Sequence, residues 1–227
     1  MCGIVGYVGP RQATSIVVEG LKRLEYRGYD SAGVTVLQNG RLALCRSVGK
    51  LTNLVSALEV DPLSGHIGMG HTRWATHGEV TEANAHPHTD CRGEIVVIQN
   101  GIVENYVELK EELRAEGHIF RSQTDTEVIS HLVEKYYSQG GDLATAVRQA
   151  LNRMEGFNAI VVLSSHEPDK LVAARLGSAG GVVIGQGQDE MLLASDMPAL
   201  LDHTQRMIFL ENRDGSLRCD IDEIFVG

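Results

Sequence analysis

The sequence predicts an α+β fold in which antiparallel sheets are covered by helices. Short apolar runs at hairpin spacing, such as those around Asn39-Gly40, occur in both halves of the chain. Segments with helical periodicity are grouped between these runs, which argues against a parallel sheet built from alternating strands and helices. No repeat or low-complexity linker divides the chain, so we expect one domain over residues 1–227.

The composition is that of an ordinary globular protein. The 227 residues are 43% hydrophobic and carry a formal net charge of -10. This charge and the lack of a basic run disfavour nucleic acid and anionic membranes as partners. The four cysteines have no regular spacing, and there is no secretory signal or apolar run of about 18 residues. We therefore expect a reducing, cytoplasmic location and no disulfide framework.

The first nine residues predict a buried strand that opens with a thiol. Cys2 follows the initiator methionine, and the residues behind it are apolar or glycine. If Met1 is removed, Cys2 has a thiol with a pKa of about 8.5 and an α-amine with a pKa of about 7.7–8.0. A nucleophile and its base then share one residue. The alternative is a small buried residue that opens a central strand, and this segment alone does not separate the two.

The N-terminal half reads as helices and strands joined by polar loops. Apolar residues at helical spacing, from Ile16 to Leu24, predict a helix that ends near Tyr26. The pattern then predicts a loop at 26–33, strands at 34–37 and 41–47, a helix at 51–58, a strand at 67–70 and polar loops at 71–78 and 79–93.

The C-terminal half alternates groups of helices with hairpins. The apolar run 95–98 predicts a strand that stops at Gln99-Asn100-Gly101. Helical spacing then predicts helices near 106–113, 124–136 and 143–151, with Asp142 as the cap of the last. Strands are predicted at 158–164, 171–175, 182–185 and 191–194, a brief helix at 196–198, and a last hairpin of 208–210 with 217–219 around Asp214-Gly215.

Three polar positions suggest a site for acyl transfer. Asn100 and Gly101 follow a buried strand, so a side-chain amide and a backbone N–H can point at one oxyanion. Arg73, in a polar loop, can bind a carboxylate, and Asp125, near a helix start, can bind an ammonium group. Together these two charges would hold an amino acid by both ends. The alternatives are an ordinary Asn-Gly turn and two solvated charges.

Metal and nucleotide sites are not predicted. His71, His77, His86, His88 and Cys91 offer suitable ligand atoms, but their spacing matches no zinc motif. The glycine-rich segment 177–181 lacks the lysine of a phosphate-binding loop and the helix of a dinucleotide motif. We expect no metal and no cofactor.

With these residues in place, the chain resembles the class II glutamine amidotransferases over nearly its whole length. Among them it is most similar to the glutaminase domains of the glutamine:fructose-6-phosphate amidotransferases (isomerizing). The resemblance rests on six separated motifs in order, and such a set is far more specific than any one motif. These are Met1-Cys2-Gly3-Ile4-Val5-Gly6, the segment from Leu24 to Gly33, His71-Thr72-Arg73-Trp74-Ala75-Thr76-His77-Gly78, Asn84-Ala85-His86-Pro87-His88, Asn100-Gly101-Ile102 and Thr124-Asp125-Thr126-Glu127-Val128.

The resemblance implies a fold and a set of roles. The fold is the N-terminal nucleophile (Ntn) hydrolase sandwich, two antiparallel sheets between helix layers. Cys2 would attack the side-chain amide of L-glutamine, with Asn100 and Gly101 binding the oxyanion. The substrate-binding residues would be Arg73 and Asp125 for the two charged groups of glutamine, and Trp74, Thr76 and His77 in the flap and pocket.

The resemblance also suggests what lies outside this chain. Full synthases of this kind have two further sugar-isomerase domains that bind fructose 6-phosphate, and the complete enzyme can form a homodimer. We therefore expect an excised domain that supplies ammonia for glucosamine 6-phosphate synthesis. Gln99 stands where relatives often have histidine, and the segment 177–181 lacks a proline common after Gly-Ser. The alternatives are the glutaminase part of an amidophosphoribosyltransferase, or a glutamine-binding module that keeps Met1 and does not turn over.

Overall fold

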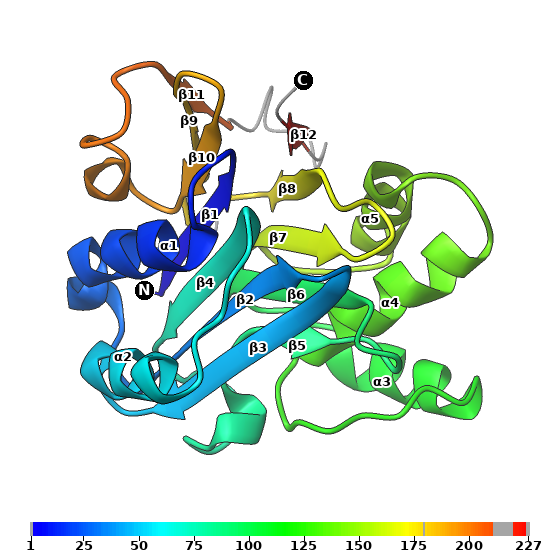
Figure 1. Cartoon of the computed structure of the whole chain (residues 1–227). Coiled ribbons are helices and arrows are strands. Elements are labelled where there is room, and N and C mark those ends of the chain that lie inside the picture. The colour runs from blue at the N-terminus through cyan, green and yellow to red at the C-terminus, as the bar shows by residue number, and fades with distance from the viewer. Residues whose placement is uncertain (1, 179, 211–219, 226–227) are drawn as a thin grey trace.

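The computed structural model describes residues 2–178, 180–210 and 220–225, and it contains two antiparallel sheets that pack face to face. Figure 1 shows the strands in the middle of the molecule, with one group of helices on each side. The predicted α+β class is confirmed. Met1, whose removal would free the Cys2 amine, lies outside the described residues.

The first sheet has seven described strands in the order β11-β9-β10-β1-β4-β2-β3. Its central strand β1 is buried along its whole length and pairs with β4 and β10 on either side. Asn39 and Gly40, both with positive φ, turn β2 back into β3 as the sequence predicts. The strands are β1 (Gly3–Val8), β2 (Ser31–Gln38), β3 (Arg41–Val48), β4 (Ile67–Arg73), β9 (Val183–Gln186), β10 (Met191–Ala194) and β11 (Met207–Phe209).

The second sheet has five described strands in the order β12-β8-β7-β6-β5. Its inner strands are apolar on both faces, because one face meets the first sheet and the other meets helices. The strands are β5 (His88–Thr89), β6 (Ile95–Gly101), β7 (Asn158–Ser164), β8 (Lys170–Leu176) and β12 (Asp220–Phe225).

Five α-helices form the two outer layers of the described structure. The first two bury Leu21 and Leu54, among others, against the first sheet, and the other three pack on the second sheet. Asp142 accepts a hydrogen bond from the Thr145 N–H and caps the last of them, as expected. The helices are α1 (Ala13–Arg23), α2 (Leu51–Val60), α3 (Tyr106–Ala115), α4 (Thr126–Ser138) and α5 (Leu143–Leu151), and short 3₁₀ turns lie at Glu25–Arg27 (η1), Glu82–Asn84 (η2) and Met197–Ala199 (η3).

Three apolar clusters bind these layers together. One lies between α1 and α2 and the first sheet, one between the sheets, and one between the second sheet and α3, α4 and α5. Ile4 and Ile98 are fully buried in the middle cluster. A helix–sheet–sheet–helix sandwich is therefore the observed architecture.

Two strand ends predicted from the sequence were wrong. β4 continues through His71 to Arg73, and β6 continues to Gly101, because ladder partners on β1, β2 and β7 pair these polar residues. β11 pairs with β9, whereas β12 pairs with β8 of the other sheet. The strand predicted at 217–219, as the partner of 208–210 in a last hairpin, lies outside the described residues.

Among the described helices, none is both long enough and apolar enough to span a membrane.

Candidate active site

A cavity of about 380 Å³ opens where β1 begins and β6 ends. All eight residues singled out from the sequence line this one cavity, although they come from four separate parts of the chain. They are Cys2, Arg73, Trp74, Thr76, His77, Asn100, Gly101 and Asp125. A site that holds a thiol, an amide, a guanidinium and a carboxylate suits a small amino-acid substrate.

Cys2 is held at the mouth of β1 by backbone contacts. The next two backbone N–H groups donate to side-chain hydroxyls, Gly3 to Thr72 Oγ1 at 3.2 Å and Ile4 to Ser195 Oγ at 3.0 Å. The thiol sulfur accepts a hydrogen bond from the Trp74 N–H at 3.1 Å. Burial raises the pKa of the Cys2 thiol, so a nearby base must remove its proton at neutral pH.

Asn100 faces Cys2 across the interface between the sheets. Its Nδ2 donates to the Cys2 carbonyl oxygen at 3.0 Å, which fixes the amide beside Cys2. The neighbouring Gly101 has a φ of 132°, and a Cβ there would lie 2.1 Å from the Phe157 carbonyl oxygen. Only glycine fits that backbone, so the predicted Asn-Gly pair has a steric cause.

His71 fixes the orientation of the Asn100 amide. The His71 Nε2 lies 3.0 Å from the Gln99 carbonyl oxygen and 3.1 Å from Asn100 Oδ1. Both partners are acceptors, so Nε2 must carry the proton and donate. Asn100 is then left with its Nδ2 toward Cys2. From the sequence, His71 is a candidate metal ligand that fits no zinc motif, and this orienting role was not predicted.

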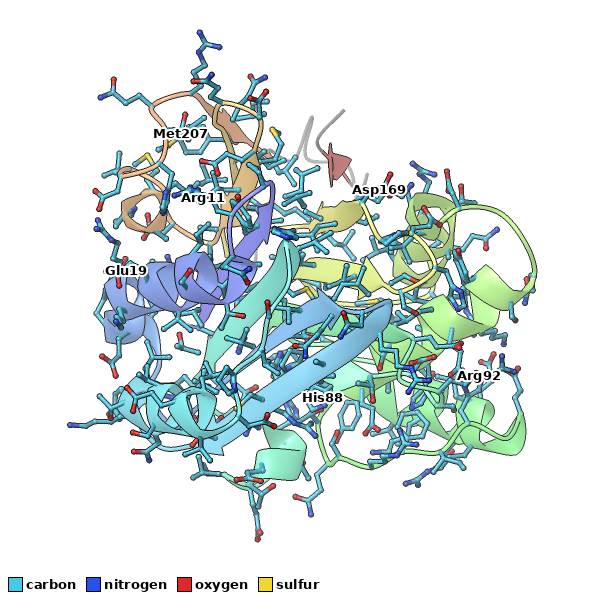
Figure 2. All side chains as sticks on the ribbon, in the orientation of Figure 1. Arg11, Glu19, His88, Arg92, Asp169 and Met207 are labelled. Atoms are coloured by element: carbon cyan, nitrogen blue, oxygen red, sulfur yellow. The ribbon has the colours of Figure 1, made fainter. Side chains whose placement is uncertain are left out.

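A row of buried histidines lies behind this amide. The His71 and His86 rings stack with their centroids 4.0 Å apart, and His88, labelled in Figure 2, follows beside His86. Burial lowers the pKa of His71 to about 4 and that of His86 well below its usual range. These rings are therefore neutral near pH 7 and act as fixed hydrogen-bonding groups.

Arg73 and Asp125 are the two charged side chains of the cavity that the sequence predicts to bind an amino acid. Arg73 is the last residue of β4, not a loop residue as predicted, and its guanidinium donates to the carbonyl oxygens of His77 and Glu79. Asp125 accepts from the Val103 N–H at 2.8 Å instead of capping α4, and its Oδ1 lies 3.8 Å from His77 Nδ1. Both side chains are buried, so each can pair strongly with a substrate charge.

The segment from Trp74 to Gly78 forms one wall of the cavity. Its base is fixed because the Ala75 N–H donates to Asp30, while Trp74 stays 53% exposed with its ring edge against Tyr29. Gly78 has a φ of 78°, a conformation that favours glycine. A segment fixed at one end, with an exposed aromatic side chain, suits a flap over a substrate.

Further residues line the cavity beyond those given a role from the sequence; one of them, Arg27, resembles a family arginine near the nucleophile whose task the sequence leaves open. Arg27 reaches the cavity from η1 and donates to Asp196 Oδ2 at 2.8 Å and to the Ser195 carbonyl oxygen. Ser178 and Gly180 also line it, from the glycine-rich segment for which the sequence suggested no site. No local motif distinguishes that segment, because its place beside Asn100 depends on the pairing of β7 with β8.

Comparison with known proteins agrees with this geometry. Residues 61–214 match the family model described as a glutamine amidotransferase domain. The chain is 52% identical over 212 residues to the glutamine–fructose-6-phosphate aminotransferase [isomerizing] of Pyrococcus horikoshii, covering 93% of this chain and 35% of that one. It is 54% identical over 215 residues to the protein of the same name from Thermus thermophilus, covering 94% and 35%. The chain thus spans about a third of these relatives.

Solved structures extend the comparison to the fold. The glutamine phosphoribosylpyrophosphate amidotransferase of B. subtilis, complexed with ADP and GMP, matches with a TM-score of 0.78 and 26% identity, covering 92% of this chain and 44% of that one. A glutamine aminotransferase class-II domain protein from Silicibacter pomeroyi matches with a TM-score of 0.60 at 17% identity, covering 85% and 88%. The sandwich of two sheets between helix layers is thus the Ntn amidotransferase fold. By family model and by sequence identity, the chain belongs to the glutamine amidotransferase family.

Proposed function

We propose that this chain hydrolyses the side-chain amide of L-glutamine, with Cys2 as the nucleophile. The α-amine of Cys2, freed by removal of Met1, takes the thiol proton while Sγ attacks the amide carbon. The tetrahedral intermediate expels ammonia, which takes that proton, and leaves a thioester. Water then attacks the thioester with the same amine as base, releasing glutamate and restoring the thiol. Glutamine and water are thereby converted to glutamate and ammonia.

The other cavity residues have matching roles in this proposal. Asn100 Nδ2 and the Gly101 N–H stabilise the oxyanion that forms on the amide oxygen. Arg73 binds the α-carboxylate of glutamine and Asp125 its α-ammonium group. On substrate binding, the Arg73 guanidinium would release the carbonyl oxygens of His77 and Glu79 and donate to the substrate carboxylate instead. Trp74, Thr76 and His77 enclose the bound substrate.

One observation supports the proposal most strongly: the 3.0 Å hydrogen bond from Asn100 Nδ2 to the Cys2 carbonyl oxygen. It joins residues 98 positions apart and sets an amide donor beside a half-buried thiol. An oxyanion donor is useful only at such a fixed short range from the nucleophile. The same thiol must stay reduced, so we also propose a cytoplasmic location.

The ammonia, we propose, serves glucosamine 6-phosphate synthesis from fructose 6-phosphate. Relatives near 50% identity are named glutamine–fructose-6-phosphate aminotransferase [isomerizing], whereas the phosphoribosylpyrophosphate amidotransferase structure is only 26% identical to this chain. Because the chain spans about a third of those relatives, the sugar would bind to sequence outside it, and homodimer formation would involve the longer protein.

The proposal is tested by glutamate release from L-glutamine, using protein whose N-terminus is shown by mass spectrometry to be Cys2. Wild-type protein should release glutamate, and Cys2→Ala should release none while still binding glutamine in calorimetry. Cys45→Ser serves as the control, because Cys45 lies on β3 away from the cavity. Equal turnover by Cys2→Ala would remove Cys2 as nucleophile.

A glutamine-binding module is the competing function, and the same experiment separates the two. Such a module would bind glutamine with correctly processed Cys2 and release no glutamate. Protein that keeps Met1 gives a second check, because its Cys2 nitrogen is an amide and has lost its basicity. It should bind glutamine without turnover if the amine is the base.

A further inference from the structure

Four potential metal ligands meet on the far side of the second sheet from the thiol nucleophile. Cys91 lies in the turn after β5, His118 follows α3, and His131 and Glu134 lie one turn apart on α4. One donor atom from each lies within 4.8 Å of all the others. Arg92, the neighbour of Cys91, can be seen beside α3 and α4 in Figure 2. None of these four residues lines the glutamine cavity.

The distances fit a tetrahedral ion. Cys91 Sγ lies 3.6 Å from His118 Nδ1 and 3.6 Å from His131 Nδ1. Zinc bonds of about 2.3 Å to sulfur and 2.0–2.1 Å to nitrogen, at a tetrahedral angle, place sulfur and nitrogen about 3.5 Å apart. Glu134 Oε2 lies 2.9 Å from the first nitrogen and 3.1 Å from the second, so all four atoms face one centre.

The surroundings of His131 resemble the outer shell of a metal site. Its Nδ1 points at Cys91 and Glu134, and its buried Nε2 has no hydrogen-bond partner among the described residues. The Glu127 carboxylate lies 3.8 Å from that Nε2 and is itself held by the Arg121 and Ser122 N–H groups, each at 2.7 Å. Metal-binding histidines commonly direct their second nitrogen to such a carboxylate.

Two backbone donors also suit ligands with negative charge. The Ile119 N–H donates to Cys91 Sγ at 3.5 Å, and the Cys91 N–H donates to Glu134 Oε2 at 3.3 Å. A cavity of about 660 Å³ borders His118 and Glu134 and offers an entry path. One thiolate and two imidazoles select zinc-type ions over calcium or magnesium, which prefer oxygen ligands.

We propose that Cys91, His118, His131 and Glu134 bind one zinc-type ion in a closed structural site. The ion would fasten the turn after β5 and the segment after α3 to α4, which begins next to Asp125. This proposal revises the expectation of no metal. The sequence suggested Cys91 as a ligand together with His71, His77, His86 and His88, and none of these four histidines belongs to the proposed site. It does not depend on the proposed glutamine hydrolysis.

The test measures zinc in protein with the Cys2→Ala background, so that the N-terminal thiol does not contribute. Protein from zinc-supplemented cultures should contain one equivalent of zinc after dialysis, and Cys91→Ser should lose most of it. Cys45→Ser is the matched control and should keep it, because Cys45 is also half-buried but belongs to no metal-ligand cluster among the residues that the structure describes. Glu127→Gln should weaken zinc binding about 10–100-fold, as measured against a chromophoric chelator.

Cobalt provides a readout that does not depend on how the variants fold. Metal-free protein with the Cys2→Ala background and an intact ligand cluster is titrated with Co²⁺. It should develop a thiolate-to-cobalt charge-transfer band and the intense visible bands of a tetrahedral ion. Absence of the thiolate band, or zinc retained in full by Cys91→Ser, would overturn the proposal. Stripping zinc should lower the melting temperature of the background protein and leave that of Cys91→Ser unchanged.

Discussion

Replacing His71 with phenylalanine tests whether this buried ring positions the Asn100 amide. Phenylalanine keeps a ring that can stack on His86 but removes the Nε2–H that both Gln99 O and Asn100 Oδ1 accept. Two buried acceptors then lose their shared donor, which costs about 1–3 kcal/mol of unfolding free energy at pH 7. The freed amide can also turn away from Cys2, so glutamate release should fall about tenfold or more.

At low pH the same substitution should raise the free energy of unfolding instead of lowering it. Burial lowers the pKa of folded His71 to about 4, whereas the unfolded side chain titrates near 6.5. Below pH 6.5 the unfolded chain therefore binds a proton that the folded chain does not. The contribution of His71 is fully present above pH 6.5 and is lost as the pH falls toward 4. Integrating this linkage gives a loss of about 3 kcal/mol at pH 4.

The two effects make the stability curves cross. Wild type should be more stable than His71→Phe at pH 7 by about 2 kcal/mol, and less stable at pH 4 by about 1 kcal/mol. The crossing falls near pH 5, within reach of urea unfolding at a series of pH values. The control is His66→Phe, because His66 is exposed and lies outside the cavity. If the free energies of unfolding of wild type and His71→Phe differed by the same amount at every pH, the conclusion that His71 is buried and neutral would be refuted.

Three further substitutions test the proposed site. Asn100→Ala should lower kcat about 10²–10³-fold with little change in KM, because it removes a donor that acts on the transition state, and an equal rise in KM would point to ground-state binding. Arg73→Ala should raise KM by the equivalent of a few kcal/mol, and an unchanged KM would exclude Arg73 from substrate binding. Gly101→Ala should lower the midpoint of urea unfolding, because its Cβ would lie 2.1 Å from the Phe157 carbonyl oxygen, and a midpoint equal to that of wild type would contradict this backbone.

The sequence predicted those elements that local chemistry determines. Asn39-Gly40 defined a hairpin, Asp142 defined a helix start, and the periodicity of residues 106–151 located three helices. The prediction failed where pairing with a distant strand determines the local structure. Polar residues 71–73 and 99–101 look like loop residues, yet they are strand residues because neighbouring strands satisfy their backbones. The strand at 220–225 joins β8 in the other sheet, and no local pattern encodes that choice.

The candidate site likewise contains residues that the sequence predicted and residues that it did not. Cys2 and Arg73, for example, could be selected from residue type and sequence neighbours, whereas Trp74, Thr76 and His77 came from the family resemblance. The groups that orient them could not be selected in either way. His71 lies 29 residues from Asn100, and the Cys91 cluster joins segments up to 43 residues apart. Such contacts depend on the register of strands and helices, which motif spacing does not reveal.

The placement of the proposed nucleophile, Cys2, follows from the contact between the two sheets. Cys2 precedes β1 of the first sheet, and Asn100 lies at the end of β6 of the second. Two hydrogen bonds cross between them: His71 on β4 donates to Asn100, and Asn100 donates to the Cys2 carbonyl oxygen. Because the apolar cluster that contains Ile4 and Ile98 fixes the spacing of the sheets, packing far from the cavity also sets the distance between nucleophile and oxyanion donor. A mutation that shifts this cluster should therefore reduce turnover even where no cavity residue changes.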